Sequence, residues 1–359
     1  MRILSFKRPV KVQRTVVPAQ RGHVWPDGFA RWCRAHHAEL IEEDRPLIAP
    51  WYRPYRGQDL TDKSILLWRS GGFGDILFLT PLLRELKKRH PTATVAFATA
   101  PAYQIVLRHN RDVDRILPLP VSDEQLAQYD FHLHFEGTIE AAKDPQLHAV
   151  DLMAARAGMT VGEKLPVYAV APALGKAIKD DFFARVAPVE TTKLIAVQAA
   201  ASSQVRTYPP PKLAAIVEAL AAAGHCCLIF GLARHRLPLR EDLKRVIDLT
   251  GKTSMELATA MLSFCDLLIA PDSSLVHFAA ALNVPTVALY GPFPGTARTR
   301  YYPLCVTLEA QRHCAPCFLH GDEPCPWAQR RSQCWSPCFD SLPPDLIVET
   351  AQRHLTRMC

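Results

Sequence analysis

The sequence predicts an α/β protein with two similar halves, because two stretches each lead from a short apolar strand through a polar loop into a helix. One stretch begins at Ser64 and the other, about two hundred residues later, at Leu267. Short apolar strands that alternate with helices are typical of parallel sheets covered on both faces. Ligands of such sheets bind beyond the carboxyl ends of the strands, so each stretch is a candidate binding corner.

The first corner follows a predicted strand over Ser64–Trp68. Its loop holds three glycines and an aspartate: Gly71, Gly72, Gly74 and Asp75. Glycine lets a backbone turn sharply and approach a ligand closely. Thr80 and Pro81 predict the N-cap and the first residue of a helix over Leu82–Arg89, and a further strand is expected over Thr94–Thr99. Taken alone, the loop also fits a plain tight turn, because it is neither the dinucleotide fingerprint nor a P-loop.

The second corner is the more specific one. A strand over Leu267–Ala270 ends at Pro271 and is followed by three residues of the types that cap helices: Asp272, Ser273 and Ser274. A helix is expected over Leu275–Leu282, with Asn283 ending it in the left-handed conformation, and then a strand over Thr286–Tyr290. A helix N-terminus at this edge of a sheet attracts phosphate through its free N–H groups and its dipole. This corner therefore predicts a nucleotide-binding site.

Composition narrows the class of protein. A chain of 359 residues can form two domains, and 48% hydrophobic residues argue against extensive disorder. The sequence has no run of eighteen apolar residues and no apolar N-terminal stretch long enough for a secretory signal, so we expect a cytoplasmic protein. The formal net charge of +7 fits general solubility, or attraction to an anionic ligand and to an anionic membrane surface. Nucleic acid is not an expected partner, because no basic helix with interleaved aromatic residues stands out.

Together, the two corners resemble glycosyltransferase family 9, the bacterial heptosyltransferases that build the inner core of lipopolysaccharide. The first half of the resemblance is carried by Gly74-Asp75 and the following Thr80-Pro81-Leu82-Leu83. The second half is carried by Asp272-Ser273-Ser274 with His277, and by residues 285–292. The resemblance implies a GT-B type fold, in which two Rossmann-like domains face each other across a cleft. It also implies inverting transfer of a heptose from ADP-heptose to a hydroxyl group, by default that of a lipopolysaccharide core sugar.

The resemblance further implies two catalytic residues. Asp75 stands where family members have the base that takes the proton from the acceptor hydroxyl, and a helix N-cap is the alternative role for an aspartate beside a glycine. Arg206, in the weaker match Arg206-Thr207-Tyr208-Pro209, is the candidate that neutralises the leaving nucleoside diphosphate in place of a catalytic metal. An ordinary surface arginine is the alternative for Arg206.

The expected donor-binding set contains eight residues from both corners and from the loop after a strand at Ile195–Gln198: Gly72, Gly74, Ser202, Ser203, Asp272, Ser273, Ser274 and His277. The serines would donate to phosphate, and Asp272 would contact the ribose or sugar or only hold its turn. A packed core histidine is the alternative for His277. The sequence departs from the family at Ala199–Ala201 and at Ser274, where the family tends to have glycine.

Five cysteines form a cluster near the C-terminus with the spacing C-x2-C-x7-C-x8-C-x3-C: Cys314, Cys317, Cys325, Cys334 and Cys338. Clustered thiols in a cytosolic chain indicate metal binding more than disulfides. Any four of them could hold a structural zinc or iron ion, with His313 and His320 as substitutes, and reduced thiols are the alternative. A similar iron-binding cysteine finger occurs in the subgroup of this family that modifies autotransporter proteins with heptose. A protein acceptor is therefore the alternative to lipopolysaccharide.

The expected organisation has five parts. They are an N-terminal extension without an assigned role over residues 1–60, an acceptor-side Rossmann-like domain over 61–165, a linker over 166–190, a donor-binding Rossmann-like domain over 191–310, and a cysteine-rich segment with a C-terminal helix over 311–359. Within the second part, a strand from Phe131 should place His132, His134 and Glu136 on one solvated or cleft-facing side, with metal binding as the alternative. The competing function class is a non-catalytic scaffold that keeps this fold and assembles through its metal-stapled tail.

Overall fold

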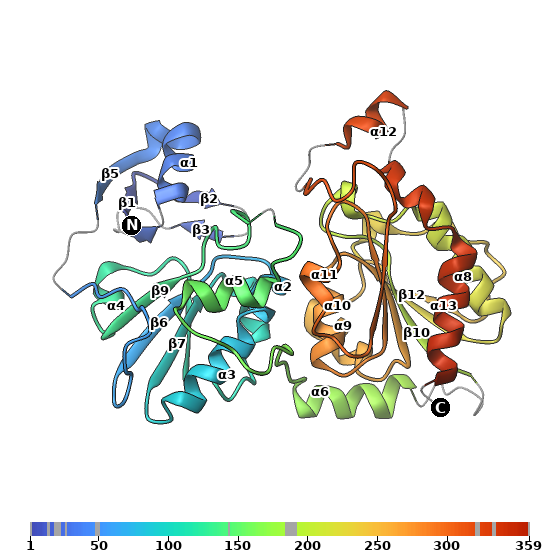
Figure 1. Cartoon of the computed structure of the whole chain (residues 1–359), viewed down its shortest axis with the longest axis horizontal. Coiled ribbons are helices and arrows are strands. Elements are labelled where there is room, and N and C mark those ends of the chain that lie inside the picture. Colours follow the sequence, from blue (N-terminus) through green and yellow to red (C-terminus); the bar gives the residue numbers. More distant parts are fainter. Residues whose placement is uncertain are drawn as a thin grey trace. The chain divides into compact units, whose positions relative to one another are not determined.

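The computed structural model describes residues 2–12, 15–17, 23–25, 27–46, 51–142, 144–183, 192–319, 324–331 and 335–357. Contacts divide the chain into two compact units, which Figure 1 shows. The first unit comprises Met1–Ala142 and Ala149–Val167, and the second comprises Lys143–His148 and Tyr168–Cys359. Within the described part of the chain, no helix combines the length and the apolar character that a membrane crossing requires.

The first unit is built on a four-stranded parallel sheet with the order β8-β7-β6-β9. Its strands are β6 (Ser64–Trp68), β7 (Thr94–Thr99), β8 (Arg115–Pro118) and β9 (Phe131–His134). The two strands predicted first, β6 and β7, are confirmed with their expected bounds. The chain extends the sheet from β6 in one direction and then returns to add β9 on the other side of β6. The boundary between β6 and β9 is therefore the topological switch point, where ligands of open α/β sheets bind.

The helices that connect these strands include one correction to the sequence analysis. They are α2 (Phe73–Leu77), α3 (Thr80–Arg89), the 3-10 helix η2 (Pro101–Val106), α4 (Asp123–Leu126) and α5 (Ala149–Arg156). Thr80 was expected as the N-cap of α3, but it is the first helical residue and Leu79 is the N-cap. The Thr80 hydroxyl donates to the Leu77 carbonyl at 2.7 Å and accepts from the Val167 N–H at 2.7 Å. It therefore fastens α3 to neighbouring backbone instead of capping the helix.

Much of the segment expected as an N-terminal extension is an integral layer of the first unit. It contains the antiparallel sheet β4-β1-β5, a helix and a two-stranded ribbon: β1 (Arg2–Phe6), β2 (Val10–Val12), β3 (Thr15–Val17), β4 (His23–Trp25), α1 (Asp27–His37), the 3-10 helix η1 (Ala38–Leu40) and β5 (Ile41–Pro46). Ile3 and Val24 share a buried cluster with Leu66 and Trp68 of β6. The small sheet therefore covers apolar surface of the larger one.

The expected solvated face of β9 is wrong for His132. This residue is only 1% exposed, because the ring of Tyr52 stacks on it with the centroids 4.9 Å apart. Its Nε2 lies 2.8 Å from the Leu126 carbonyl, and its Nδ1 lies 3.2 Å from the Arg53 N–H. Burial lowers the pKa of His132 below its usual value. With both ring nitrogens bonded to main chain, this histidine has no atom left for a metal ion.

The second unit is built on a six-stranded parallel sheet with the order β12-β11-β10-β13-β14-β15. Its strands are β10 (Leu194–Gln198), β11 (Cys226–Phe230), β12 (Val246–Asp248), β13 (Leu267–Pro271), β14 (Thr286–Tyr290) and β15 (Cys305–Glu309). In chain order this arrangement is 3-2-1-4-5-6, the order of the Rossmann fold. The predicted strands at Leu267 and Thr286 are confirmed, and the switch point lies between β10 and β13.

Helices cover both faces of this sheet. They are α6 (Pro172–Ala177), which continues as a π-helix over Ile178–Phe183, α8 (Pro210–Ala222), α9 (Met255–Leu262), α10 (Ser274–Ala281), α11 (Thr296–Thr299), α12 (Pro326–Arg330) and α13 (Pro344–Arg357). Three short 3-10 helices are η4 (Gln204–Arg206), η5 (Ala233–His235) and η6 (Pro337–Ser341). In Figure 1, α8 and α13 lie on one face of the sheet, and α9 and α10 lie on the other. As predicted, Asn283 follows α10 in the left-handed conformation, with φ 57°.

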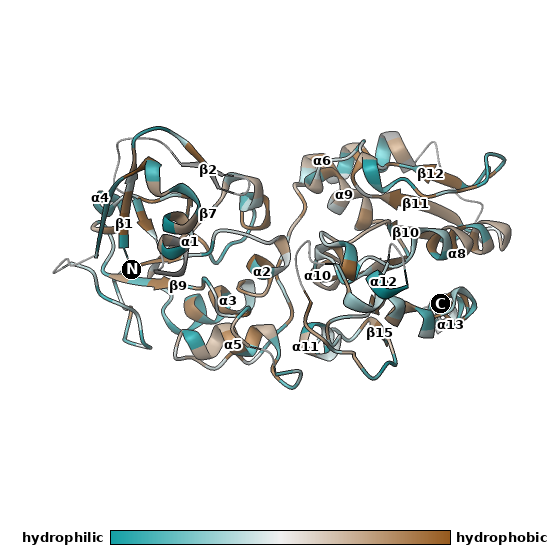
Figure 2. Ribbon diagram, turned by 90° about the horizontal axis from the view of Figure 1, so that it is seen from above, coloured by the Kyte–Doolittle hydropathy of each residue, from teal (hydrophilic) through white to brown (hydrophobic). Residues whose placement is uncertain are grey.

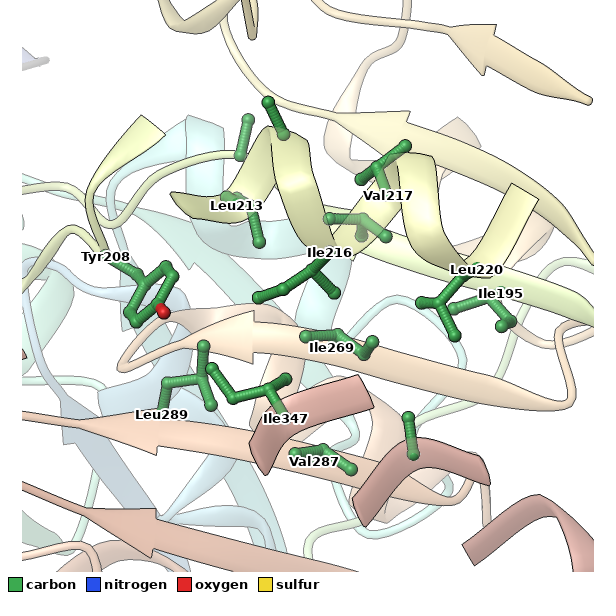
Figure 3. Packing of buried hydrophobic residues seen from close by; sticks show 14 of the residues in the cluster. Ile195, Tyr208, Leu213, Ile216, Val217, Leu220, Ile269, Val287, Leu289 and Ile347 are labelled. Carbon is green, nitrogen blue, oxygen red and sulfur yellow. The ribbon is translucent and has the colours of Figure 1, made fainter. Parts of the chain in front are cut away.

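The core of the second unit lies between its sheet and the pair α8 and α13. Figure 3 shows Ile216 and Leu220 of α8 above the strand residue Ile269, and Ile347 of α13 beside Leu289. The strands β10 and β11 carry mostly hydrophobic residues, as Figure 2 shows by colour. Because α13 supplies Ile347, Ala351 and Leu355 to this core, the C-terminal helix contributes to the stability of the unit.

We expect Ile347→Ala to lower the free energy of unfolding of the second unit by about 3 kcal/mol, because it removes buried methyl groups and leaves a cavity. Ile347 is 0% exposed. Urea denaturation followed by circular dichroism measures this change. The matched control on the same helix is Glu349→Ala, which removes only an exposed ion pair with Arg353 and should cost less than about 1 kcal/mol. Equal effects of the two substitutions would contradict the packing of α13 against the sheet.

Candidate active site

Two loops meet at the switch point of the second unit. One follows β10 and carries Ser202, Ser203 and Arg206, and the other follows β13 and carries Asp272 and Ser273. Because β10 and β13 are parallel neighbours, their carboxyl ends lie side by side. The strand order thus brings together residues that are 66 positions apart in the sequence.

A buried ion pair joins these two loops. Arg206 Nη1 donates to Asp272 Oδ2 at 3.2 Å, and Arg206 Nη2 donates to Ser202 Oγ at 2.5 Å. The Arg206 side chain is 12% exposed and the Asp272 side chain 7% exposed. The alternative of an ordinary surface arginine is therefore wrong. Removing one partner would leave a buried charge uncompensated, which typically costs 3–5 kcal/mol.

Positive charge dominates the surroundings of Asp272. Burial alone would raise the pKa of this carboxyl, but Arg206 and Arg298 outweigh burial and hold the pKa below its usual value. Both arginines also lie over the ring of Phe293, with the guanidinium carbons 6.0 Å and 5.5 Å from its centroid. A site with two guanidinium groups and one carboxylate retains a net attraction for an anion.

Three buried polar atoms on the two loops can still form hydrogen bonds. Arg206 Nε, Ser203 Oγ and Ser273 Oγ are buried and have no hydrogen-bond partner within the described part of the structure. Buried polar groups in folded proteins are nearly always hydrogen-bonded, so such a group of atoms indicates a place where a polar ligand binds. The three atoms can all donate, and donors suit the oxygens of a phosphate group.

The N-terminus of α10 lies at this switch point, directly after the loop that carries Asp272 and Ser273. Ser273 is its N-cap residue, but its side chain makes no capping bond, and Ser274 is the first helical residue. The predicted capping residues are thus placed correctly, whereas the predicted side-chain cap is not formed. The first N–H groups of a helix are free to bind an anion, which the helix dipole also attracts.

His277, on the second turn of α10, is a buried neutral histidine. It is 4% exposed, and its Nδ1 lies 2.9 Å from the hydroxyl of Tyr302. Burial lowers the pKa of His277 to about 3, although the negative charge of Asp272 opposes this shift. The imidazole therefore stays neutral at physiological pH. His148, whose ring lies 4.5 Å from that of Tyr301, extends this aromatic cluster.

The switch point of the first unit carries a different arrangement of the same residue types. Arg69, directly after β6, is 2% exposed and donates from Nη1 to the Phe135 carbonyl at 2.6 Å. Its Nη2 donates to Asp75 Oδ2 at 2.7 Å and to Glu140 Oε1 at 2.6 Å. Burial would lower the pKa of Arg69, but the two carboxylates raise it above its usual value. The buried guanidinium of Arg69 thus binds the carboxylates of Asp75 and Glu140.

Asp75 itself remains accessible. Its side chain is 32% exposed, and it lies inside α2, whose N-cap residue is Gly72. The alternative role of Asp75 as an N-cap is therefore wrong. Gly72 has φ +83°, which favours glycine, and a Cβ atom there would collide with the Asp75 carboxylate. Gly74, also in α2, accepts a hydrogen bond from the Phe78 N–H at 2.9 Å.

A third carboxyl group lies at the same switch point. Ser70 donates to Glu136 through its N–H and through its hydroxyl, the latter at 3.0 Å. Burial raises the pKa of Glu136 above its usual value, against the opposing charge of Arg69. Sequence reasoning placed Glu136 on a strand, but β9 ends at His134. It missed Arg69 and Glu140 altogether, although Arg69 stands two residues before the glycine loop.

The predicted site residues thus fall into three groups. Arg206 contacts both Ser202 and Asp272. The other members of this group lie on the same two loops and on α10: Ser203, Ser273, Ser274 and His277. Asp75, Gly72 and Gly74 belong to the first unit. The cysteine cluster forms the third group, in the segment after β15.

Four of the five predicted cysteines line one cavity of about 210 Å³: Cys314, Cys317, Cys325 and Cys338. Cys334 and His320 lie outside the described residues. His313 is exposed, and its ring lies 5.3 Å from that of Trp327. Burial and the neighbouring thiols raise the pKa of Cys338 to about 12. The described residues contain no group of three or more His, Cys, Asp or Glu side chains already arranged to hold a metal ion.

Comparison with known proteins gives a consistent result. A family model described as glycosyltransferase family 9 (heptosyltransferase) matches residues 138–327, more than half of the chain. Lipooligosaccharide heptosyltransferase 2 of Haemophilus influenzae is 34% identical over 95 residues, which cover 24% of this chain and 28% of that protein. The protein of the same name from Campylobacter jejuni is 26% identical over 140 residues, which cover 36% of this chain and 41% of that protein. The chain thus spans less than half the length of these curated relatives.

Two solved structures share the fold. The ADP-heptose lipopolysaccharide heptosyltransferase II of Escherichia coli superposes with a TM-score of 0.63 at 16% identity, over 82% of this chain and 99% of that one. The iron-containing dodecameric glycosyltransferase TibC of enterotoxigenic E. coli superposes with a TM-score of 0.61 at 14% identity, over 97% of this chain and 87% of that one. Both support two Rossmann-like units. On the family match and the observed strand order, the chain belongs to glycosyltransferase family 9, the heptosyltransferase family.

Proposed function

We propose that this protein is an inverting glycosyltransferase that transfers a heptose from ADP-heptose to a hydroxyl group of a lipopolysaccharide core sugar. The observation that carries the proposal is the Arg206–Asp272 pair at the switch point of the second unit, with unpartnered buried donors around it. Such donors beside a helix N-terminus suit the diphosphate of a nucleotide sugar. The first unit is accordingly proposed as the acceptor side and the second as the donor side.

The proposed reaction assigns one role to each charged group. The Asp75 carboxylate takes the proton from the acceptor hydroxyl, whose oxygen then forms a bond to the anomeric carbon. The bond from that carbon to the diphosphate breaks on the opposite face, and ADP leaves with the electron pair. Arg206, Ser273 and the N–H groups of α10 stabilise the negative charge that develops on the diphosphate. Arg69 fixes the direction of the Asp75 carboxylate and is a positioning residue.

Two alternatives differ from this proposal in the acceptor and in the class of function. A protein acceptor is the alternative raised by the cysteine cluster, which resembles the cysteine finger of the autotransporter-modifying subgroup. The superposition with the iron-containing TibC covers 97% of this chain and therefore includes both the N-terminal layer and the cysteine segment. Incubation of the enzyme with ADP-heptose and either a core oligosaccharide or an autotransporter passenger, read by mass spectrometry, discriminates between the acceptors. A scaffold would modify neither. The formal net charge of +7 is consistent with a cytoplasmic enzyme that associates with anionic lipid at the inner face of the bacterial inner membrane.

The donor can be tested through thermal unfolding. We expect ADP-heptose at a hundredfold excess over its Kd to raise the Tm by roughly 5–10 °C, because it binds only the folded state. UDP- and GDP-linked sugars should have little effect. In Arg206→Lys, the charge remains but the bidentate fork is lost, so affinity for ADP should fall about tenfold to a hundredfold. Arg236→Lys is the matched control, because Arg236 only forms an exposed ion pair with Asp248. Unchanged ADP affinity in Arg206→Lys would reject the proposed donor site.

The base can be tested with Asp75→Asn. The amide oxygen still accepts the hydrogen bond from Arg69, so the protein should fold and bind ADP normally. Turnover should fall by about two to four orders of magnitude, because the amide cannot take a proton. Asp59→Asn, an exposed carboxylate of the same unit, is the control. Full turnover in Asp75→Asn would assign the base elsewhere, with Glu140 and Glu136 as the next candidates.

We also propose that Cys314, Cys317, Cys325 and Cys338 hold one structural zinc or iron ion. The donor set fits, since four thiolates are a common ligand set for either metal and all four side chains line the same cavity. Binding would draw the thiols to ligand distance and would supply a cross-link between chain segments, not a catalytic group. The purified full-length protein should contain about one equivalent of metal by mass spectrometry, and Cys314→Ser with Cys317→Ser should remove it. Cys226→Ser should retain it.

A further inference from the structure

The cavity that Cys314, Cys317, Cys325 and Cys338 line, here called the cysteine pocket, is hydrogen-bonded to the loop that carries Arg206. Ser336, which lines the pocket, is 2% exposed, and its hydroxyl donates to the Val205 carbonyl at 2.8 Å. Val205 directly precedes Arg206. The hydroxyl is therefore a direct link from the pocket wall to the backbone at the base of the guanidinium side chain.

A second connection runs from the pocket to the guanidinium itself through two aromatic rings. The N–H groups of Cys317 and Phe318 both donate to the Pro292 carbonyl, at 3.0 Å and 2.9 Å. Phe318 has φ 55°, a strained conformation for this residue that persists only when its surroundings fix it. Its ring packs edge-on against Phe293 at 5.6 Å. Phe293 in turn lies under the Arg206 guanidinium.

A third connection anchors the residue on the far side of Thr207. The Tyr208 hydroxyl donates to the Leu342 carbonyl at 2.7 Å, and its ring packs edge-on against Phe339 at 5.5 Å. Figure 3 shows Tyr208 at the end of the buried cluster, next to Leu213. Phe339 follows Cys338 directly, so the chain on both sides of Arg206 is fastened to the segment that carries this thiol.

We infer that the cysteine pocket is a positioning element for Arg206, and that closing it around a metal ion sets the affinity of the donor site for the nucleotide diphosphate. The described residues of the segments around the pocket, 310–319, 324–331 and 335–343, contain no regular element besides the five-residue helix α12 and the 3-10 helix η6. Ordering such irregular chain costs about 1–2 kcal/mol per residue, and a metal cross-link offsets part of that cost. With the pocket open, Ser336 and Phe318 lose their fixed positions, and the Arg206 guanidinium keeps its contacts with Asp272 and Ser202 but loses the support of Val205 and Phe293. The inference rests on the proposed donor role of Arg206.

The competing interpretation is that the thiols only fill a local core. That interpretation predicts a lower Tm for pocket variants but an unchanged affinity for ADP. The two interpretations therefore differ in a binding constant, which can be measured on the full-length protein without any acceptor or turnover.

The decisive variant is Ser336→Ala, which keeps all four thiols and removes the link to Val205. By isothermal titration calorimetry, we expect its affinity for ADP to fall about fivefold to tenfold at unchanged metal content, the size typical of one lost hydrogen bond. Ser263→Ala removes a similar serine-to-carbonyl bond at the end of α9 and is the control, with less than a twofold change. Phe318→Leu, which breaks the ring contact with Phe293, should weaken ADP binding in the same way.

Metal removal is the second arm. Chelator treatment of the wild-type protein should weaken ADP binding by a similar factor, and added Zn²⁺ or Fe²⁺ should restore it. Cys338→Ser should bind ADP weakly with or without chelator, whereas Cys226→Ser, at the start of β11, should respond like the wild type. Wild-type ADP affinity in Ser336→Ala, Phe318→Leu and the chelated protein would overturn the inference. If Arg206→Lys still weakened binding in that case, the proposed function would stand; if Arg206→Lys had no effect either, both would fall.

Discussion

The buried ion pair between Arg206 and Asp272 is the constraint on which the arrangement of the second unit's switch point depends. Two charges withdrawn from water are tolerated only while each has the other as partner, so the loops after β10 and β13 cannot move independently. The 3-2-1-4-5-6 strand order places those loops side by side, and the pair keeps the guanidinium oriented before any ligand arrives. Preorganised charge of this kind needs no rearrangement as negative charge develops on a leaving group.

The two units use the same residue types with opposite burial. In the second unit, the carboxylate is the more deeply buried partner, at 7% exposure against 12% for the arginine, and the guanidinium keeps an unpartnered buried Nε within the described structure. In the first unit, the arginine is 2% exposed and Asp75 is 32% exposed. One switch point therefore presents a cation to a ligand, and the other presents a carboxylate. This difference is consistent with the proposed anion-binding site in the second unit and the proposed base in the first.

The sequence predicted what is local and missed what depends on strand order. Strand bounds at Ser64 and Thr286 and the left-handed Asn283 follow from short-range patterns of apolar residues and turn residues. The contacts of Arg69 could not be predicted from the sequence, because they form only where β9 lies beside β6. Its partners Phe135 and Glu140 come more than sixty positions later in the chain. The expectation for His132 failed for a related reason. Period-two alternation cannot show that Tyr52, eighty residues earlier in the chain, covers the strand face.

The cysteine segment illustrates how an irregular stretch becomes part of a site. Gly291 and Pro292 follow β14, the strand next to β13, so they lie at the same edge of the sheet as Asp272. A Cβ atom at Gly291 would lie 3.0 Å from Cys338 Sγ and 2.8 Å from the Phe339 ring, so the close approach of this segment requires glycine there. The cysteine segment can therefore pack against this edge of the sheet only because residue 291 has no side chain. Such close packing is expected of a segment that supports the backbone around Arg206. A tail that only joined copies of the chain together would not need it.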